Sequence, residues 1–396
     1  MKILIITPRI PFPPHRGDKL KIFNIVNFFR KNHQVKVVTF SQGSEDAKNA
    51  EELKKLDVDV SFVNLPILQS VFSVLFAVFS KTPFQSAYFK SSSMKNLISS
   101  EINKEDYDVV YFHLIRSAQY AHLFNGKKIK KIIDFTDAVS LYLARYIKVI
   151  KNPLRKLFFF WELKRIEKYE TVGENFDRVY VCSETDRNCL SERINKEKIK
   201  IISNGVDLST FTPVETPKEN NRIIFTGNMP YFPNYDAVEH FVKDIFPNVQ
   251  KEIPDSKFYV VGQKPPKFIK DMENKSIKVT GFVEDIRAEY LKSTVNIAPI
   301  RFGAGTLNKI IESLVLGIPV VASSLSVAGM TEDLKKFVLV AENEKDFSEK
   351  VISVLKNPEE YSKKLIDSRD EIISILDWNN ILSKFENEIT NLVSNE

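Results

Sequence analysis

The chain has 396 residues, enough for two domains of ordinary size, and its 43% apolar and 27% charged residues are typical of a soluble globular protein. Its net charge of +6 is small for this length, which fits an acidic small ligand or an anionic membrane surface and gives little support to nucleic-acid binding. Its two cysteines, Cys182 and Cys189, do not form a CxxC pair, so we expect reduced cytosolic thiols and no metal site.

The amino-terminal stretch MKILIITPRIPFPP is typical of a buried strand that ends at a proline. It has no charged leader, long apolar region or small-residue cleavage site, so we do not expect a signal peptide. The longest apolar run, at 71–79, is far below the ~20 residues that span a bilayer. We therefore expect a cytoplasmic protein, either free or bound to the inner face of the cell membrane.

Short apolar runs alternate with helical patterns in the first half of the chain. The expected strands lie at 2–8, 34–40, 57–65, 107–114, 130–137 and 177–183, and a helix is expected at 19–33. Such alternation favours a parallel sheet, because each crossover helix packs back on the sheet.

This alternation pauses at 198–221, where a short strand leads into Asn-Gly, prolines and a polar run that are typical of a linker. It resumes with strands expected at 222–229, 256–263, 277–283, 295–303 and 318–324, and an amphipathic helix is expected at 376–393. We predict an α/β protein with two Rossmann-like domains, at 1–205 and 206–396. Ligands are expected at the carboxyl ends of the strands, in a cleft where the two domains face each other.

The loop after the first strand, PRIPFPPHRGDKLK, contains several basic side chains, among them Arg9, His15 and Lys19. Gly17 would let the backbone approach a ligand. We interpret the loop as a site for an acceptor or a phosphate. The alternative is a proline-stiffened turn in which Asp18 caps the next helix.

Polar residues also end two later strands. His113 follows YDVVYF and can hydrogen-bond a substrate, although a lone histidine is more often structural. Asp134 and Asp137, in IIDFTD, can bind sugar hydroxyls or cap the following helix. The residues themselves leave these alternatives open.

The stretch APIRFGAGTLNKIIESLVLGIPVVAS, from residue 298, joins a strand to a helix through a turn of small residues. Such a turn lets the backbone come close to a ligand, and the helix N-terminus with Arg301 and Lys309 suits a diphosphate. Glu312 can accept two hydrogen bonds from a vicinal diol such as ribose. The alternative is close packing of strand on helix. The pattern is neither GxxxxGK[ST] nor the GxGxxG of a nicotinamide enzyme.

Together with IISNGVDLSTFTP, FTGNMPYFPNYDAVEHF, GFVED and a terminal helix led by Trp378, these stretches resemble glycosyltransferase family 4. The chain looks most like bacterial sugar transferases of exopolysaccharide systems. The resemblance runs from the first strand to the last helix. It implies the GT-B fold, with two Rossmann-like domains facing a central cleft and a carboxy-terminal helix that returns towards the N-terminal domain. It also implies acceptor binding by 1–205 and nucleotide-sugar binding by 206–396.

The resemblance assigns roles by position. His113 matches a histidine that contacts the donor sugar, Glu312 an acid that binds ribose, and Val283 a loop that contacts the base. The implied catalytic residues are His113, Lys309 and Glu312. The implied donor-binding residues are Gly227, Asn228, Val283, Arg301, Gly303, Ala304, Gly305, Thr306, Lys309 and Glu312, and the implied acceptor-binding residues are Arg9, His15, Gly17, Lys19 and Asp137.

The sequence departs from the family pattern at several positions, among them the tandem glycine of the first loop, which is Gly17-Asp18 here. The first acid of the E-x7-E motif is replaced by Ala304, and the usual Arg–Lys pair falls on Asn228 and Asn234. These replacements recur in the subgroup with GAGT, so we do not interpret them as inactivation. They leave Lys309 and Arg301 as the cations expected to neutralise the leaving diphosphate.

We predict a hexosyltransferase-like enzyme that moves a sugar from a nucleotide diphosphate sugar to a surface polysaccharide or lipid-linked glycan. Retention of configuration and independence of metal are implied by the resemblance, and no cofactor besides the nucleotide-sugar co-substrate is expected. One alternative is a nucleotide-sugar epimerase, which would turn over donor without acceptor. Another is a non-catalytic nucleotide-sugar-binding subunit of a polysaccharide assembly complex, which Ala304 and the two asparagines motivate.

The segment 146–170, YIKVIKNPLRKLFFFWELKRIEKYE, mixes basic and aromatic residues. Segments of this kind can lie in a membrane interface, and the apolar run at 71–79 is a second candidate. Together they predict contact with an anionic membrane surface. The alternative is that both helices pack on the sheet with their basic side chains in solvent.

Overall fold

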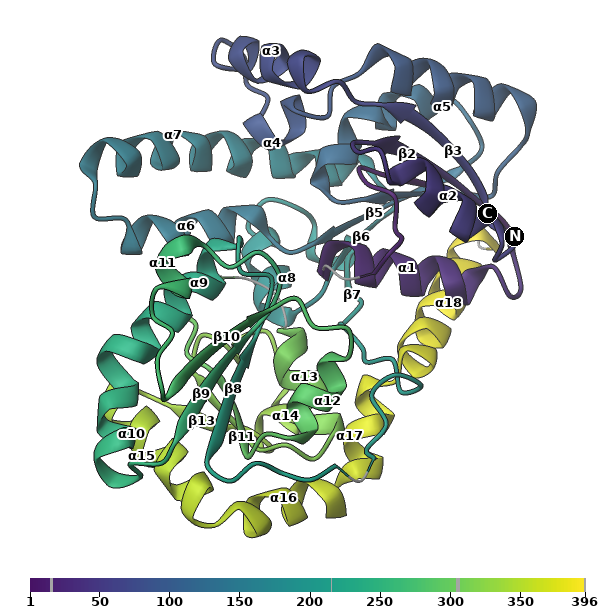
Figure 1. The fold of residues 1–396 in the computed structure, drawn as a ribbon. Coiled ribbons are helices and arrows are strands. Elements are labelled where there is room, and N and C mark those ends of the chain that lie inside the picture. The colour runs from purple at the N-terminus through teal and green to yellow at the C-terminus, as the bar shows by residue number, and fades with distance from the viewer. Residues whose placement is uncertain (15–16, 215, 304–306, 395–396) are drawn as a thin grey trace. The chain divides into compact units, whose positions relative to one another are not determined.

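The computed structural model describes residues 1–14, 17–214, 216–303 and 307–394. The chain divides into two compact units, each a parallel sheet with helices (Figure 1). The amino-terminal unit comprises Met1–Ser203 and Leu382–Glu396, and the carboxy-terminal unit comprises Asn204–Ile381. The predicted α/β architecture with two parallel sheets is therefore confirmed.

The sheet of the amino-terminal unit has the strand order β3-β2-β1-β4-β5-β6-β7, with every neighbouring pair parallel. Its strands are β1 Lys2–Thr7, β2 Gln34–Ser41, β3 Asp59–Asn64, β4 Val109–His113, β5 Lys130–Thr136, β6 Arg178–Val181 and β7 Ile199–Ile201. The helices between them are α1 Gly17–Phe29, α2 Asp46–Lys54, α3 Ile67–Ala77, α4 Phe84–Ala87, α5 Ser92–Lys104, the 3-10 helix η1 Ile115–Phe124, α6 Val139–Val149, α7 Pro153–Glu170, η2 Thr171–Asn175, α8 Glu184–Leu190 and η3 Lys196–Lys198.

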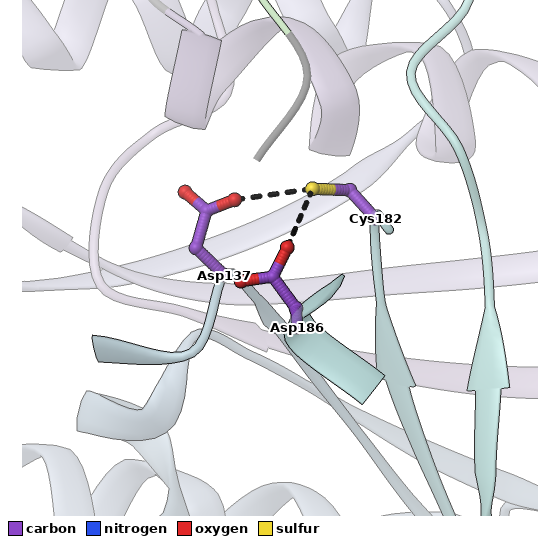
Figure 2. A group of neighbouring side chains, drawn as sticks. All are labelled: Asp137, Cys182 and Asp186. Carbon is purple, nitrogen blue, oxygen red and sulfur yellow. Dashed lines mark hydrogen bonds between the residues drawn. The ribbon is translucent and has the colours of Figure 1, made fainter. Parts of the chain in front are cut away.

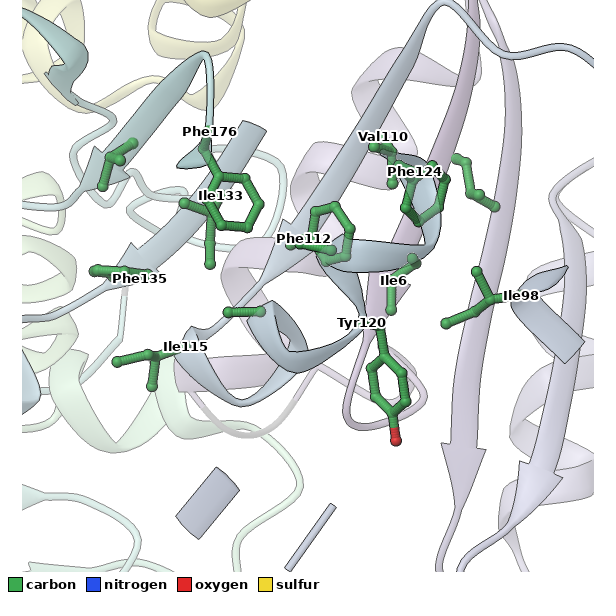
Figure 3. Packing of buried hydrophobic residues seen from close by; sticks show 14 of the residues in the cluster. Ile6, Ile98, Val110, Phe112, Ile115, Tyr120, Phe124, Ile133, Phe135 and Phe176 are labelled. Atoms are coloured by element: carbon green, nitrogen blue, oxygen red, sulfur yellow. The ribbon is translucent and has the colours of Figure 1, made fainter. Parts of the chain in front are cut away.

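The central strands β1, β4 and β6 are buried on both faces, which explains why they are continuous apolar runs. Successive residues of a strand point to opposite faces. On one face, the Phe112 ring packs edge-on against Phe124 at 5.6 Å and Phe176 at 5.3 Å between centroids (Figure 3). On the other face, Tyr111 contacts Phe385 of the terminal helix at 6.2 Å. This packing on two sides holds β4, and with it the position of His113 at its end.

The terminal helix α18, Trp378–Ser394, crosses the division between the units. From Leu382 onward it belongs to the amino-terminal unit, whereas we had expected one domain at 206–396. The reason is an apolar contact: Phe385 packs edge-on against Phe29 at 5.5 Å and Tyr180 at 4.8 Å. An ion pair between His33 and Glu386, with Nε2 and Oε1 2.6 Å apart, adds to it.

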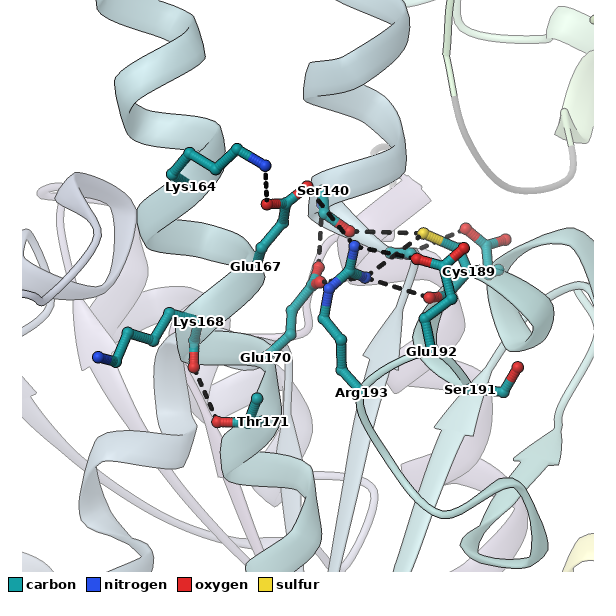
Figure 4. A network of polar contacts seen from close by, with 12 residues as sticks. Ser140, Lys164, Glu167, Lys168, Glu170, Thr171, Cys189, Ser191, Glu192 and Arg193 are labelled. Atoms are coloured by element: carbon teal, nitrogen blue, oxygen red, sulfur yellow. Dashed lines mark hydrogen bonds and ion pairs between the residues drawn. The ribbon is translucent and has the colours of Figure 1, made fainter.

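A polar network joins α6, α7 and α8 (Figure 4). Ser140, in the first turn of α6, donates its backbone N–H to the buried Glu170 of α7 at 2.9 Å. Arg193, which follows α8, lies 3.6 Å from the same carboxylate and donates to the carbonyl of Cys189 at 3.1 Å. Because an otherwise unpaired N–H at the start of α6 gains a carboxylate partner, the network fixes the chain just after Asp137.

The sheet of the carboxy-terminal unit has the order β10-β9-β8-β11-β12-β13, again with parallel pairs. Its strands are β8 Arg222–Thr226, β9 Lys257–Val261, β10 Ile277–Gly281, β11 Val295–Ala298, β12 Val320–Ser323 and β13 Leu339–Ala341. Its helices are α9 Phe232–His240, the π-helical turn η4 Phe241–Ile245, α10 Phe246–Glu252, α11 Lys267–Lys270, α12 Ile286–Leu291, α13 Asn308–Val315, α14 Glu332–Lys335, α15 Glu344–Lys356, α16 Pro358–Asp367 and α17 Arg369–Leu376.

Helices α9, α10 and α15 cover one face of this sheet, and α12 and α13 cover the other (Figure 1). The strand β13 was not among the predicted strands, because three residues are too few to show a pattern. Gly317 ends α13 with φ +72°, and Ile318 donates its backbone N–H to the carbonyl of Ser313 at 2.9 Å. This left-handed cap is the helix end that the sequence predicted.

Candidate functional site

Three neighbouring strands of the carboxy-terminal sheet end in glycine, and their loops lie very close together. Gly227 follows β8, Gly262 follows β9, and Gly281 ends β10 with φ +74°. A Cβ atom on Gly262 would lie 1.7 Å from the carbonyl oxygen of Gly227, so no side chain fits there. Backbone therefore forms this part of the edge, where parallel α/β sheets bind ligands.

Lys309, in the first turn of α13, points its ammonium to this edge and is only 7% exposed. Its Nζ donates to Oδ1 of Asn234 at 2.9 Å and lies 3.6 Å from the centroid of the Phe225 ring. Asn234, on α9, in turn donates to the carbonyl of Asn228 at 2.9 Å. Burial lowers the pKa of Lys309 to about 7, and the nearby Glu312 opposes this shift.

Glu312 lies one turn after Lys309 on the same helix and is partly exposed. Its Oε2 accepts a hydrogen bond from the Tyr290 hydroxyl at 3.1 Å, and that hydroxyl is also 2.5 Å from Oγ1 of Thr226. Burial raises the pKa of Glu312 to about 7, against the effects of Tyr290 and Lys309. The carboxyl is thus held by a buried tyrosine and can accept further hydrogen bonds.

Arg301, after β11, forms a bidentate ion pair with Asp236 of α9. Nε lies 2.9 Å from Oδ2, and Nη2 lies 2.5 Å from Oδ1. The Asp236 carboxylate raises the pKa of Arg301. Its side chain is 45% exposed, and Asp236 offsets part of its charge.

The predicted donor residues therefore fall into three groups. Gly227, Asn228, Lys309 and Glu312 come together through Asn234 and Tyr290, whereas Arg301 and Gly303 follow β11. Val283 is partly buried, and its side chain packs against the apolar cluster around Tyr290. Ala304, Gly305 and Thr306 lie outside the residues that the structure describes.

In the amino-terminal unit, His113 ends β4 and is 2% exposed. Its Nδ1 lies 3.0 Å from Oγ1 of Thr7, and its Nε2 has no hydrogen-bond partner among the described residues. Burial lowers the pKa of His113 to about 4, so the imidazole is neutral near pH 7. The next residue, Leu114, has φ 65° and ψ 150°, a conformation otherwise reserved for glycine. Such strain marks this strand end as a place to expect function.

Asp134 proves to be structural. Its carboxylate forms a fully buried ion pair with Lys21 of α1, with Oδ2 and Nζ 2.8 Å apart. It also accepts hydrogen bonds from the Tyr111 hydroxyl at 2.6 Å and the Thr136 backbone N–H at 2.7 Å. These partners, Lys21 above all, lower the pKa of Asp134 against the effect of burial. Sequence reasoning missed Lys21, because a lysine on a helix is normally exposed.

Asp137 forms a cluster with Cys182 and Asp186 (Figure 2). The Cys182 thiol donates to Asp137 at 3.1 Å and lies 3.8 Å from Asp186. Burial and the charge of Asp186 raise the pKa of Asp137 to about 7. One potential ligand atom from each residue lies within 4.8 Å of the others, the spacing of a metal site.

The three side chains of this cluster are joined by hydrogen bonds to one another and to the backbone. Burial raises the pKa of the Cys182 thiol well above its ordinary value, so the sulfur keeps its proton and donates it. Asp186 already accepts the backbone N–H of Ala138 at 2.9 Å and the hydroxyl of Ser183. Metal independence itself stays a prediction.

Two basic side chains of the expected acceptor loop, Arg9 and Lys19, already have partners. Asp18 lies in the first turn of α1 and forms an ion pair with Arg9, with Nη1 and Oδ2 2.5 Å apart. Lys19 donates to the carbonyl of Phe12 at 3.2 Å. Gly17 begins α1, and a Cβ atom there would meet nothing within 4 Å, so packing does not require glycine. His15 lies outside the described residues.

This architecture, with two parallel α/β units and a polar edge in each, is that of the GT-B class. Among solved structures, sucrose-phosphate synthase from Thermosynechococcus elongatus is similar with a TM-score of 0.73, 13% identity and 100% of both chains covered. A glycosyltransferase from Rickettsia africae has a TM-score of 0.71 and 17% identity over 100% of this chain and 99% of that one. Anabaena Alr3699/HepE in complex with UDP-glucose has a TM-score of 0.70 and 13% identity over 100% of both chains.

Family models identify the chain more closely. Residues 22–210 match Glycosyltransferase Family 4, and residues 220–357 match Glycosyl transferases group 1. Since these two matches cover most of the chain, the protein belongs to the glycosyltransferases, as its motifs predicted. A relative with 22% identity over 377 residues is an uncharacterized 44.6 kDa protein in the cps region of Klebsiella pneumoniae; the match covers 90% of this chain and 91% of that protein.

Proposed function

We propose that this glycosyltransferase uses a nucleoside diphosphate sugar as donor and retains the configuration of the transferred sugar. The observation that carries the proposal is the position of Lys309, a nearly buried cation beside a glycine-lined backbone edge. Cleavage of the anomeric bond leaves negative charge on the diphosphate. A fixed ammonium and backbone N–H groups stabilise such charge most effectively where water is excluded.

Asn234 is the positioning residue for this cation in the proposal. The family's second cation would fall at this position, and here the asparagine instead accepts a hydrogen bond from Lys309. Arg301 is oriented in a similar way by Asp236, two residues along α9. Arg301 thus comes from the connection after β11 and Lys309 from the first turn of the following helix, and α9 contributes the groups that orient them.

Glu312 is proposed to bind the ribose diol, with Tyr290 holding its carboxyl in place. His113 is proposed to bind the donor sugar. Its Nε2 has no hydrogen-bond partner among the described residues, and because the ring is neutral near pH 7 this nitrogen can hydrogen-bond a sugar hydroxyl without a change of charge. Asp137, with its pKa raised to about 7, is proposed to bind the acceptor together with Arg9, Gly17 and Lys19.

The similar proteins suggest a first candidate for the donor base and a first candidate for the acceptor. The Anabaena protein was solved with UDP and with UDP-glucose, and the Klebsiella relative lies in a cps region. We therefore propose a uridine diphosphate sugar and a polysaccharide or lipid-linked glycan acceptor. An epimerase remains the enzymatic alternative. A non-catalytic subunit has less support, because Lys309 compensates in charge for the two asparagines.

The test is calorimetric binding of UDP, GDP, CDP and their sugars to the wild type and to Glu312→Ala and Lys309→Met. Lys345→Met, an exposed lysine of α15, is the matched control. Binding of one base that weakens in both site variants supports the donor site. Absence of binding by every nucleotide would contradict the proposal. Release of UDP only when a glycan acceptor is added would separate a transferase from an epimerase.

A further inference from the structure

Helix α3 of the amino-terminal unit carries its apolar side chains outward. The exposed large apolar residues on and just after the helix are Ile67, Leu68, Val71, Phe72, Leu75, Phe76, Val78 and Phe79. Phe76 is 73% exposed and Phe79 is 91% exposed. The buried positions of the helix are instead the small residues Ser70 and Ala77. A surface helix normally buries its apolar stripe, whereas α3 exposes its apolar stripe to solvent.

Helix α7 presents a second apolar stripe. Leu154, Leu157, Phe158 and Trp161 are exposed and follow the i, i+3, i+4, i+7 spacing of one helix face. The later half of the same helix is conventional, because Leu163 and Ile166 pack in an apolar cluster with α6. The exposed stripe is therefore confined to the first half of α7.

The two stripes are linked through α4, which packs against α3 and begins with Phe84. Its ring stacks on Phe158 at 5.6 Å with an interplanar angle of 7°, and lies 5.6 Å from Trp161. Arg165 of α7 fastens this junction, since it donates to the carbonyl of Ala77 at 2.6 Å and forms a buried ion pair with Glu162 at 3.0 Å. We call the exposed apolar residues of 67–79 and 154–161, with Phe84, the α3–α7 surface.

The segments that carry the α3–α7 surface are rich in basic residues, and Glu162, beside this surface, is paired with Arg165. Residues 60–100 and 138–161 contain no aspartate or glutamate, although the chain has 51 acidic residues in all. The same segments contain Lys81, Lys90, Lys95, Arg145, Lys148, Lys151, Arg155 and Lys156. Lys90 lines a groove of about 600 Å³ together with Phe72 and Phe76, so a cation lies directly beside the apolar side chains.

We propose that the α3–α7 surface binds a lipid bilayer that contains anionic headgroups. Phenylalanine and tryptophan side chains enter the interface between headgroups and acyl chains, while the surrounding lysines attract the negative surface. A second copy of this chain would bring like charges together, which disfavours a symmetric dimer through this surface. Among the described residues, no helix is both long and apolar enough to cross a membrane, so the contact would be peripheral. This inference goes beyond the proposed transfer reaction and does not depend on it.

The test is flotation of the intact protein with vesicles of phosphatidylglycerol or of phosphatidylcholine, at low and high salt. We expect flotation with phosphatidylglycerol that weakens with salt, and roughly tenfold weaker binding for the double variant Phe76→Ser with Phe79→Ser. Both side chains are exposed, so the variant should keep the wild-type thermal transition. Ile366→Ser, at a 60% exposed isoleucine of α16, is the matched control and should float like the wild type.

A charge variant separates the two contributions. Lys151→Gln with Lys156→Gln should lose the preference for phosphatidylglycerol, while Lys345→Gln keeps it. The inference is overturned if the wild type stays in the bottom fraction with both vesicles at low salt, or if the phenylalanine variant floats unchanged. Light scattering that shows a dimer abolished by the phenylalanine variant, without flotation, would identify a protein interface instead. Nucleotide binding measured without vesicles tests the proposed function separately.

Discussion

The hydrogen bond between Asn234 and Lys309 allows a quantitative test of how much the Lys309 ammonium, and its orientation by Asn234, contribute to UDP binding. We would replace Lys309 with methionine, which keeps the chain over the Phe225 ring but removes the ammonium, and Asn234 with alanine, alone and combined. A hydrogen bond to a charged group contributes about 1.5–3 kcal/mol. Lys309→Met should therefore weaken UDP binding roughly ten- to hundredfold.

Asn234→Ala should weaken UDP binding by about 1 kcal/mol, or roughly fivefold, because the 7% exposed ammonium loses the side chain that orients it. If Asn234 acts through Lys309, the same change should have no further effect in the Lys309→Met background. Isothermal titration of UDP against the four proteins gives the coupling energy directly. Equal losses from Asn234→Ala in both backgrounds would refute the positioning role, and Lys345→Met should match the wild type.

Three further predictions concern pH, backbone and buried charge. UDP affinity should fall as the pH rises through about 7, approaching tenfold per pH unit, because bound diphosphate favours the protonated form of Lys309. When UDP binding is titrated across this pH range, Lys309→Arg should lose the dependence of affinity on pH, and Glu312→Gln should keep it. Gly262→Ala should destabilise the protein by about 3 kcal/mol or more in thermal unfolding, whereas Gly17→Ala, with open space around it, should melt like the wild type. Lys21→Met should cost about 3–5 kcal/mol at pH 7, since it leaves a buried aspartate unpaired, and a melting temperature within a degree or so of the wild type would contradict the buried ion pair.

Much of the architecture follows from local patterns. The strands after residues 1, 33, 108 and 221 were predictable, because each is an apolar run long enough to be buried on two faces. The helix cap at Gly317 was also predictable from glycine after an amphipathic segment. The short strand β13 and the division of α18 between the units were not, since neither has a local signature.

For the site, position along the chain predicted which residues end the strands but not what they contact. The partners Asn234 and Lys309 are 75 residues apart, and Asp236 and Arg301 are 65 apart. The family comparison identified Asn234 only as an uncharged residue at a position where the family usually has a cation. Its part in holding another cation appears only when α9 and α13 are placed at the same sheet edge.

The amino-acid sequence by itself determined the alternation of strands and helices, the two-unit plan and the family, because these depend on local periodicity and short motifs. Tertiary structure alone decided three things: that Lys21 and Asp134 neutralise each other, that Asp137 shares a cluster with Cys182, and that α3 turns its apolar stripe to solvent. The physical reason is the same in each case. An apolar stripe or a charged side chain has the same local pattern whether it is buried or exposed, and only its neighbours in space determine its burial, its partners and its pKa.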